Sequence, residues 1–233
     1  MSTPKSRVSR AFWLRQLSDS ALPVGGFSFS VGLEAAVAAG RVTSERSLGE
    51  FLLAAVRQSA TCDGVASLAA CRATVRGDFA EARRADERLS LFKTGDENRR
   101  MSLRMGHKLA ELARDMLPEE APGRWAEAIR KGEIAGHHAT TMGVLFSTLE
   151  LSEEELFTTL LYGIASQITS AALRLMRIDH LATQRLLFGL APQVEELYAE
   201  LAPRTLDEIE LFAPELEILA SMHEQGTQRM FMN

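Results

Sequence analysis

The sequence has few cysteines and lacks any long run of apolar residues. Cys62 and Cys71 are the only cysteines among 233 residues, which excludes a disulfide framework of the kind that holds small secreted domains together. No stretch approaches the roughly 18 consecutive apolar residues that cross a bilayer. The N-terminal residues MSTPKSR are not followed by an apolar segment of the signal-peptide kind. We therefore expect a cytoplasmic protein that does not enter a membrane.

An excess of positive charge is also missing. The formal net charge is −5, whereas binding to nucleic-acid phosphates needs a basic face. The sequence contains no Gly-x-x-x-x-Gly-Lys loop, so it has no recognisable device for holding nucleotide phosphates. We expect neither nucleic acid nor a cofactor among its ligands.

Alternating apolar and polar runs, which are typical of half-buried strands, are absent too. Apolar residues instead recur every three to four positions, and they make up 46% of the chain. We predict an all-α fold of about ten helices with no significant β-sheet, forming a single globular domain over residues 1–233. The expected helices cover residues 8–17, 33–37, 79–93 with a cap at Asp78, 96–116, 136–149, 152–175, 179–190 and 192–201. Thr43 or Ser44 is expected to cap a further helix that carries Leu48 to Val56, and Gly64 is expected to interrupt or bend it before Val65 to Cys71 continue the stripe. Pro118 and Pro122 are expected to mark a turn before a short helix from Trp125 to near Gly132, and Thr205 with Glu208 is expected to open another helix.

Two of these helices differ in character. The helix opened by the capping box of Ser152 and Glu155 carries the strongest periodic apolar stripe, so we expect it at the middle of the core. The helix over 79–93 carries a dense set of charged residues, which we interpret as a solvated face. These residues are Glu81, Arg83, Arg84, Asp86, Glu87 and Arg88.

An irregular stretch near the N-terminus stands out from the helical pattern. Ser18 to Ser20 favour bonds to their own backbone, and Pro23 stops any regular helix. Gly25 and Gly26 permit positive φ or close approach by another segment. Phe27 and Phe29 add two large rings to this flexible stretch. The pattern predicts a turn with a shape-specific role, followed by a short helix that Gly40 ends.

The same stretch carries a family resemblance. Residues 21–30 read ALPVGGFSFS and are followed by Gly32, Leu33 and Glu34, which resembles the N-terminal signature of the urease accessory protein F (UreF) family. The family usually has Tyr where this chain has Phe29. Similar patterns recur at Asn98–Gly106, at Gly136-His137-His138 with Gly143, at 171–175 with Gln184, and around Pro214, 221–224 and 229–231. Residues 177–180 depart from the family's frequent Pro-Leu-Gly-Gln, and Met232-Asn233 departs from its frequent Arg-Ser ending.

The resemblance implies a function and a set of partners. Members of this family act as chaperones in urease maturation, and they bind the accessory protein UreD (also called UreH) and the GTPase UreG. The complex inserts nickel into the apoprotein of urease in a process that depends on GTP hydrolysis, which the family member regulates. The family member is a helical homodimer. An alternative is an all-helical scaffold or regulator of the same fold that serves no urease.

The residues themselves give little support for catalysis or metal binding. Gly26 to Ser30 lack the second glycine and the preceding strand of a nucleophile elbow, so a hydrolase built on Ser28 is disfavoured. Cys62 and Cys71 are too far apart in sequence for a structural zinc pair, and no two histidines are four residues apart. Adjacent His137 and His138 point about 100° apart on a helix. We expect no enzyme, no metal site and a buried role for the methionines.

The C-terminal tail is the second candidate for partner binding. Arg229 can form paired hydrogen bonds to a carboxylate, while Met230 and Phe231 offer adaptable apolar contacts. The alternative is that the tail folds back on its own core or frays. The predicted partner-binding residues are Gly25, Gly26, Phe27, Phe29, Glu34, Arg229, Met230 and Phe231.

Overall fold

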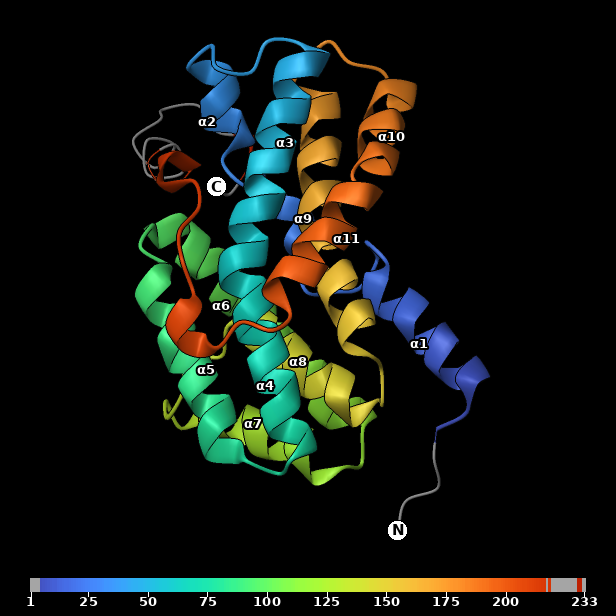
Figure 1. The fold of residues 1–233 in the computed structure, drawn as a ribbon, viewed down its shortest axis with the longest axis vertical. Helices are drawn as coiled ribbons and strands as arrows, with labels where there is room; N and C mark the ends of the chain where they lie inside the picture. Colours follow the sequence, from blue (N-terminus) through green and yellow to red (C-terminus); the bar gives the residue numbers. More distant parts are fainter. Residues whose placement is uncertain (1–4, 217, 219–229, 232–233) are drawn as a thin grey trace.

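The computed structural model describes residues 5–216, 218, 230 and 231, apart from the side chain of Phe27 (Figure 1). Within these residues the fold is all-α, as predicted, and contains no strand. Its helices are α1 Arg7–Ser18, α2 Leu33–Ala38, α3 Glu45–Ser59, α4 Val65–Val75, α5 Phe79–Phe92, α6 Asp96–Met116, α7 Glu120–Arg130, α8 His138–Thr148, α9 Glu153–Leu175, α10 His180–Gly189 and α11 Ala191–Leu201.

The expected helix starts are set by side-chain caps. Ser44, Asp78, Ser152 and Asp179 each accept a hydrogen bond from a backbone N–H in the first turn of α3, α5, α9 and α10. Ser152 and Glu155 form the predicted capping box. Such caps satisfy donors that a helix leaves unpaired at its N-terminus. The cap at Asp179 shows that residues 177–180 still open a helix.

Helices α3 and α4 form one long rod with an irregularity in its middle (Figure 1). A π-helical turn at Ala60–Gly64 joins them, so Gly64 lies at the interruption that the sequence indicated. A Cβ at Gly64 would lie 2.7 Å from Cε2 of Phe157 on α9. The glycine therefore lets the rod approach α9 closely. π-turns inside helices are frequent at functional sites.

Helix α9 packs in the core, as predicted. Leu156, Phe157 and Ile168 are fully buried along it, and α3 and α4 pack against it. Among the described helices, α9 alone is long and apolar enough to cross a membrane, but more than half of that stretch is buried within the protein. Its apolar character is explained by this burial.

The lower part of Figure 1 is a tightly packed group of helices, α4 to α8. Gly143 on α8 lies against the backbone of α4, where a Cβ would overlap the carbonyl oxygen of Ser67. Gly106 on α6 lies against the backbone just before α8, where a Cβ would overlap the carbonyl oxygen of Gly136. Only glycine fits at these two positions, because any Cβ would overlap backbone atoms of the neighbouring segment.

Three expectations need correction. The segment opened by Thr205 and Glu208 is a three-residue 3₁₀ turn, Leu206–Glu208, and not a helix. Helix α7 begins at Glu120, so Pro122 lies in its first turn, where proline is tolerated, and does not mark a turn between helices. Asp86 is wholly buried and does not belong to the solvated face of α5.

Candidate partner-binding surface

The N-terminal turn has the irregular backbone that its sequence predicted. After α1, the carboxylate of Asp19 accepts a hydrogen bond from the N–H of Ala21 at 2.8 Å. Gly25 adopts φ = +82°, a left-handed conformation that costs other residues about 1–2 kcal/mol. Residues Gly26–Ser28 then form a short 3₁₀ turn, which differs from the strand-to-helix elbow of a serine nucleophile.

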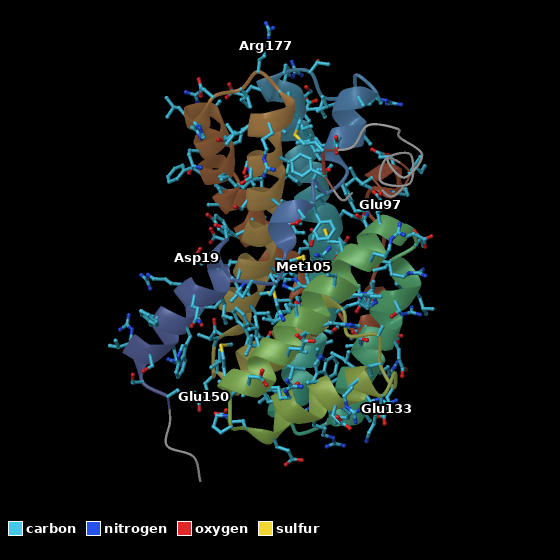
Figure 2. All side chains as sticks on the ribbon, turned by 180° about the vertical axis from the view of Figure 1, so that it is seen from behind. Asp19, Glu97, Met105, Glu133, Glu150 and Arg177 are labelled. Atoms are coloured by element: carbon cyan, nitrogen blue, oxygen red, sulfur yellow. The ribbon has the colours of Figure 1, made fainter. Side chains whose placement is uncertain are left out.

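The turn is seated on α6 and α9. A Cβ at Gly26 would lie 2.9 Å from Nε2 of Gln167 and 3.1 Å from Cε of Met105, so these side chains pack directly on the glycine backbone. The ring of Phe29 is 4% exposed. Figure 2 shows Met105 near the middle of the molecule, not far from the end of α1 that Asp19 marks. Phe29 acts in this chain as a buried residue that fixes the turn.

Two adjacent residues with left-handed backbone follow the turn, and nothing in the sequence predicts the first of them. Val31 has φ = +57° and Gly32 has φ = +78°. A β-branched residue with positive φ is strained, and such strain persists only where the surrounding structure enforces it. Ser30 beside it is fully buried, and its Oγ accepts a 3.3 Å hydrogen bond from the N–H of Glu34. The strain falls on Val31 alone, since Gly32 adopts a positive φ freely, and the two residues lead into the first turn of α2.

Glu34 joins the N-terminal turn to the C-terminal tail. Its Oε1 accepts a hydrogen bond from the N–H of Met230 at 2.8 Å, and its Oε2 accepts one from the N–H of Phe231 at 3.0 Å. Hydrogen bonds to a carboxylate are among the stronger ones in proteins. The structure thus brings together two segments nearly 200 residues apart in sequence. Both were selected from the sequence as candidates for partner binding.

The two tail residues differ in exposure. The ring of Phe231 is 5% exposed and lies under the guanidinium of Arg174 on α9, 4.7 Å from ring centroid to Cζ. The side chain of Met230 is 60% exposed, and Met116 on α6 is 45% exposed, so the expectation that the methionines are buried is wrong for these two. We define the turn–tail surface as Gly25, Gly26, Phe29, Glu34, Met230 and Phe231. Phe27 lacks a described side chain and Arg229 lies outside the described residues, so the structure places neither.

The Gly136-His137-His138 motif has a structural explanation. The buried carboxylate of Asp86 accepts hydrogen bonds from the N–H groups of Gly136 and His137, both at 2.8 Å, and from Oγ1 of Thr140 at 2.5 Å. These bonds fix the start of α8 on α5. The charge of Asp86 is stabilised by three donors, which is how a buried carboxylate remains favourable.

The imidazole of His137 lies between two serines in the same network. Nδ1 is 3.0 Å from Oγ of Ser102, and Nε2 is 2.9 Å from Oγ of Ser90. Ser102 accepts a hydrogen bond from the N–H of His138, and Ser90 donates to the carbonyl oxygen of Asp86. Burial lowers the pKa of His137, so the ring is neutral. These partners fit a ring that donates from Nε2 and accepts at Nδ1.

This network resembles a Ser-His-Asp triad in composition but not in geometry. The carboxylate of Asp86 contacts the backbone of His137 and not its ring, so it cannot orient the imidazole as a triad acid does. The proton of Ser90 is directed to a carbonyl oxygen. The network therefore stabilises the junction of α5, α6 and α8.

Clusters of conventional metal ligands are absent from the described part of the chain. No three His, Cys, Asp or Glu side chains gather within reach of one ion. Cys71 is buried, and desolvation together with the nearby carboxylate of Glu153 raises its pKa to about 11. A protonated thiol is a poor nucleophile and a poor ligand.

Comparison with known proteins identifies relatives. The family model described as UreF matches residues 42–191. The chain is 40% identical over 220 residues to "Urease accessory protein UreF 2" of Brucella canis, which covers 94% of this chain and 90% of that protein. It is 39% identical to "Urease accessory protein UreF 1" of Brucella melitensis (94% and 91% covered). It is 36% identical to "Urease accessory protein UreF" of Yersinia enterocolitica (94% and 96% covered).

Proposed function

The chain belongs to the UreF family of urease accessory proteins, and we propose that it assists nickel insertion into the urease active site by binding other proteins and not by catalysis. The proposed partners are UreD (also called UreH) and the GTPase UreG, with the urease apoprotein reached through their complex. The chain bridges these partners and controls when GTP hydrolysis is productive. The proposed setting is the cytoplasm.

One observation carries the binding role, namely the pairing of Glu34 with the backbone of Met230 and Phe231. Because this pairing holds the tail against the turn, both predicted segments form one surface. Phe231 is buried in the protein's own core and anchors the tail there. Met230 stays exposed and offers a partner an adaptable apolar contact. Phe29 and the glycine pair act indirectly, by fixing the shape of the turn beneath this contact.

The decisive experiment is co-expression of urease with its accessory proteins, with and without this chain, followed by measurement of urease activity and nickel content. We expect both to fall strongly when the chain is omitted. Full activity and full nickel content without the chain would favour the second candidate, an all-helical scaffold of the same fold that serves no urease.

The turn–tail surface is tested in the same assay with Met230→Asp. We expect loss of urease activation with unchanged helical content and melting, because the Met230 side chain is 60% exposed. Met116→Asp is the matched control, since Met116 is 45% exposed on α6 and lies outside the turn–tail surface. Arg229→Ala and removal of residues 229–233 extend the test to the part of the tail outside the described residues. Normal activation by all three tail variants would show that the tail has no such role.

Regulation of the GTPase is a separate part of the proposal. The rate of phosphate release by UreG is expected to change when this chain and UreD are added together, although the chain has no recognisable nucleotide-binding loop of its own. An unchanged rate would remove GTPase regulation from the proposal and leave the bridging role.

Self-association is the last part of the proposal. Helices α9, α10 and α11 border an apolar groove of about 410 Å³, next to which Phe188 is 87% exposed and Tyr162 is 50% exposed. Such a surface is of the kind that homodimers bury. Light scattering after size exclusion is expected to show a dimer that Phe188→Glu weakens, while Phe12→Glu on α1, also at an exposed ring, has no effect. A monomeric wild-type chain would contradict this part.

A further inference from the structure

A cavity of about 140 Å³ lies beneath the N-terminal turn, where α6, α8 and α9 meet. Met105, His138 and Met142 line it together with the backbone of Gly26. The proposed binding role on the surface above uses none of these three side chains. The proposed binding role therefore does not explain why these side chains line a cavity.

The spacing of these residues places them in two facing pairs. Met101 and Met105 are four residues apart on α6, and His138 and Met142 are four residues apart on α8. Residues at i and i+4 share one face of a helix. Helices α6 and α8 pack directly on each other, and all four residues line the same cavity. Two helices thus present thioethers and an imidazole to one partly open cavity.

His138 differs from its neighbour in how its ring is used. Both ring nitrogens of His137 are hydrogen-bonded to serines. Within the described part of the chain, the ring nitrogens of His138 have no protein partner, while its backbone N–H donates to Oγ of Ser102 at 3.4 Å. His138 is partly exposed, so its ring nitrogens are left to bind a ligand that enters the cavity.

We propose that this cavity binds one Cu⁺ ion through the imidazole of His138 and the thioether sulfurs of Met105 and Met142. Thioethers select soft cations such as Cu⁺, and imidazole suits copper as well. Ni²⁺ is not the ion that two thioethers favour, so the site is distinct from handling of the nickel cargo.

The charges around the cavity favour a monovalent ion. The carboxylate of Asp63 lines the cavity but is paired with the ammonium of Lys93 at 2.6 Å. Asp19 also lines it and is exposed at the rim. No buried carboxylate in the cavity lining remains to offset a double charge. A divalent ion would therefore lose more hydration energy than its interactions with the cavity would supply.

The competing explanation is that the methionines only pack the core. Met105 and Met142 are 6% and 4% exposed, which is typical of core residues. Leucine replaces methionine in cores at small cost, so a packing role and a ligand role respond differently to Met→Leu. The test is built on this difference.

The experiment is anaerobic competition for Cu⁺ between the full-length protein and the chromophoric chelator bicinchoninate. We expect one tightly bound Cu⁺ per chain. The double variant Met105→Leu/Met142→Leu is expected to weaken binding at least about tenfold while melting close to wild type, and His138→Ala is expected to weaken it similarly. Wild-type affinity in both variants would overturn the proposal. So would a wild-type chain that does not compete with the chelator.

Other soft donors of the chain supply the controls. Met116→Leu, Cys62→Ala/Cys71→Ala and the tail variant Met222→Leu/His223→Ala are each expected to keep wild-type affinity. Loss of binding in the cysteine or tail variant, with the cavity variants unaffected, would overturn the proposal. X-ray absorption of the copper complex is expected to show one nitrogen and two sulfur neighbours, and an all-sulfur or all-nitrogen shell would contradict it.

Discussion

The lower helix group, α4 to α8, and the turn–tail surface both depend on glycines, but for different reasons. In the lower group, Gly106 and Gly143 are needed because backbone atoms of a neighbouring segment occupy the place of a Cβ. At the turn, Gly25 is needed because its φ is +82°, while the nearest atom to a Cβ would be 3.9 Å away. The first kind of glycine maintains packing and the second shapes a surface. Substitutions in the two regions should therefore have separable effects.

Gly106→Ala is expected to have the largest effect. Its Cβ would overlap the carbonyl oxygen of Gly136, which is backbone and cannot rotate away. We expect a loss of at least about 3 kcal/mol in the free energy of unfolding, at the upper end of overpacking effects. Urea denaturation measures it. The control Gly123→Ala lies within α7 with no atom near its Cβ and should stabilise the protein by up to about 1 kcal/mol. Equal effects of the two variants would refute the packing role.

Asp86→Asn is expected to come next. An amide keeps one acceptor oxygen but places an NH₂ group near the N–H donors of Gly136 and His137, which removes hydrogen bonds inside a buried network. We expect a loss of about 3 kcal/mol in unfolding free energy. Glu87→Gln, on the exposed side of the same helix, should change it by less than about 0.5 kcal/mol. A loss below about 1 kcal/mol for Asp86→Asn would show that the network contributes little.

The error made with Asp86 shows what periodicity alone can and cannot supply. Helix positions followed from apolar spacing and caps, because both are local. Asp86 has charged neighbours on α5, but it falls on the stripe formed by Ala82, Ala85 and Leu89, all of which are buried. The stripe was therefore a usable signal. The hydrogen-bond partners of Asp86, at Gly136 and His137, were not predictable from the sequence, because they depend on how the segment before α8 crosses α5.

The candidate surface was predictable in a similar, partial way. Separate features of the sequence indicate the turn and the tail: irregular backbone chemistry for the first, and an apolar, arginine-bearing end for the second. Nothing in the sequence indicated that Glu34 would join them, because that contact arises from tertiary folding. The positive φ of Val31 was equally hidden, since valine rarely adopts it. The family model matches residues 42–191, so it covers neither the turn before it nor the tail after it.

Cys71 provides a test of the lower group at alkaline pH. Burial raises the pKa of its thiol to about 11, against about 9 when unfolded. The unfolded chain therefore loses this proton first, and stability falls as pH rises from about 9 to 11. A two-unit difference corresponds to about 2–3 kcal/mol. Cys71→Ala should lose less unfolding free energy over this range. Parallel curves for the two proteins would show that the thiol ionises normally in the fold.

Gly25→Ala is expected to have the smallest effect on stability, and it separates the two regions most clearly. Its cost is only that of a left-handed backbone, about 1 kcal/mol, because the space around it is open. Gly25→Asn should cost less, since asparagine tolerates this conformation. If the turn shapes a partner-binding surface, Gly25→Ala should reduce urease activation far more than its small loss of stability explains, with Gly25→Asn between it and wild type. Unfolding by urea and urease activation, measured on the same variants, check this. Activation that simply follows stability across Gly25→Ala, Gly25→Asn and Gly106→Ala would mean that the two regions do not differ in role.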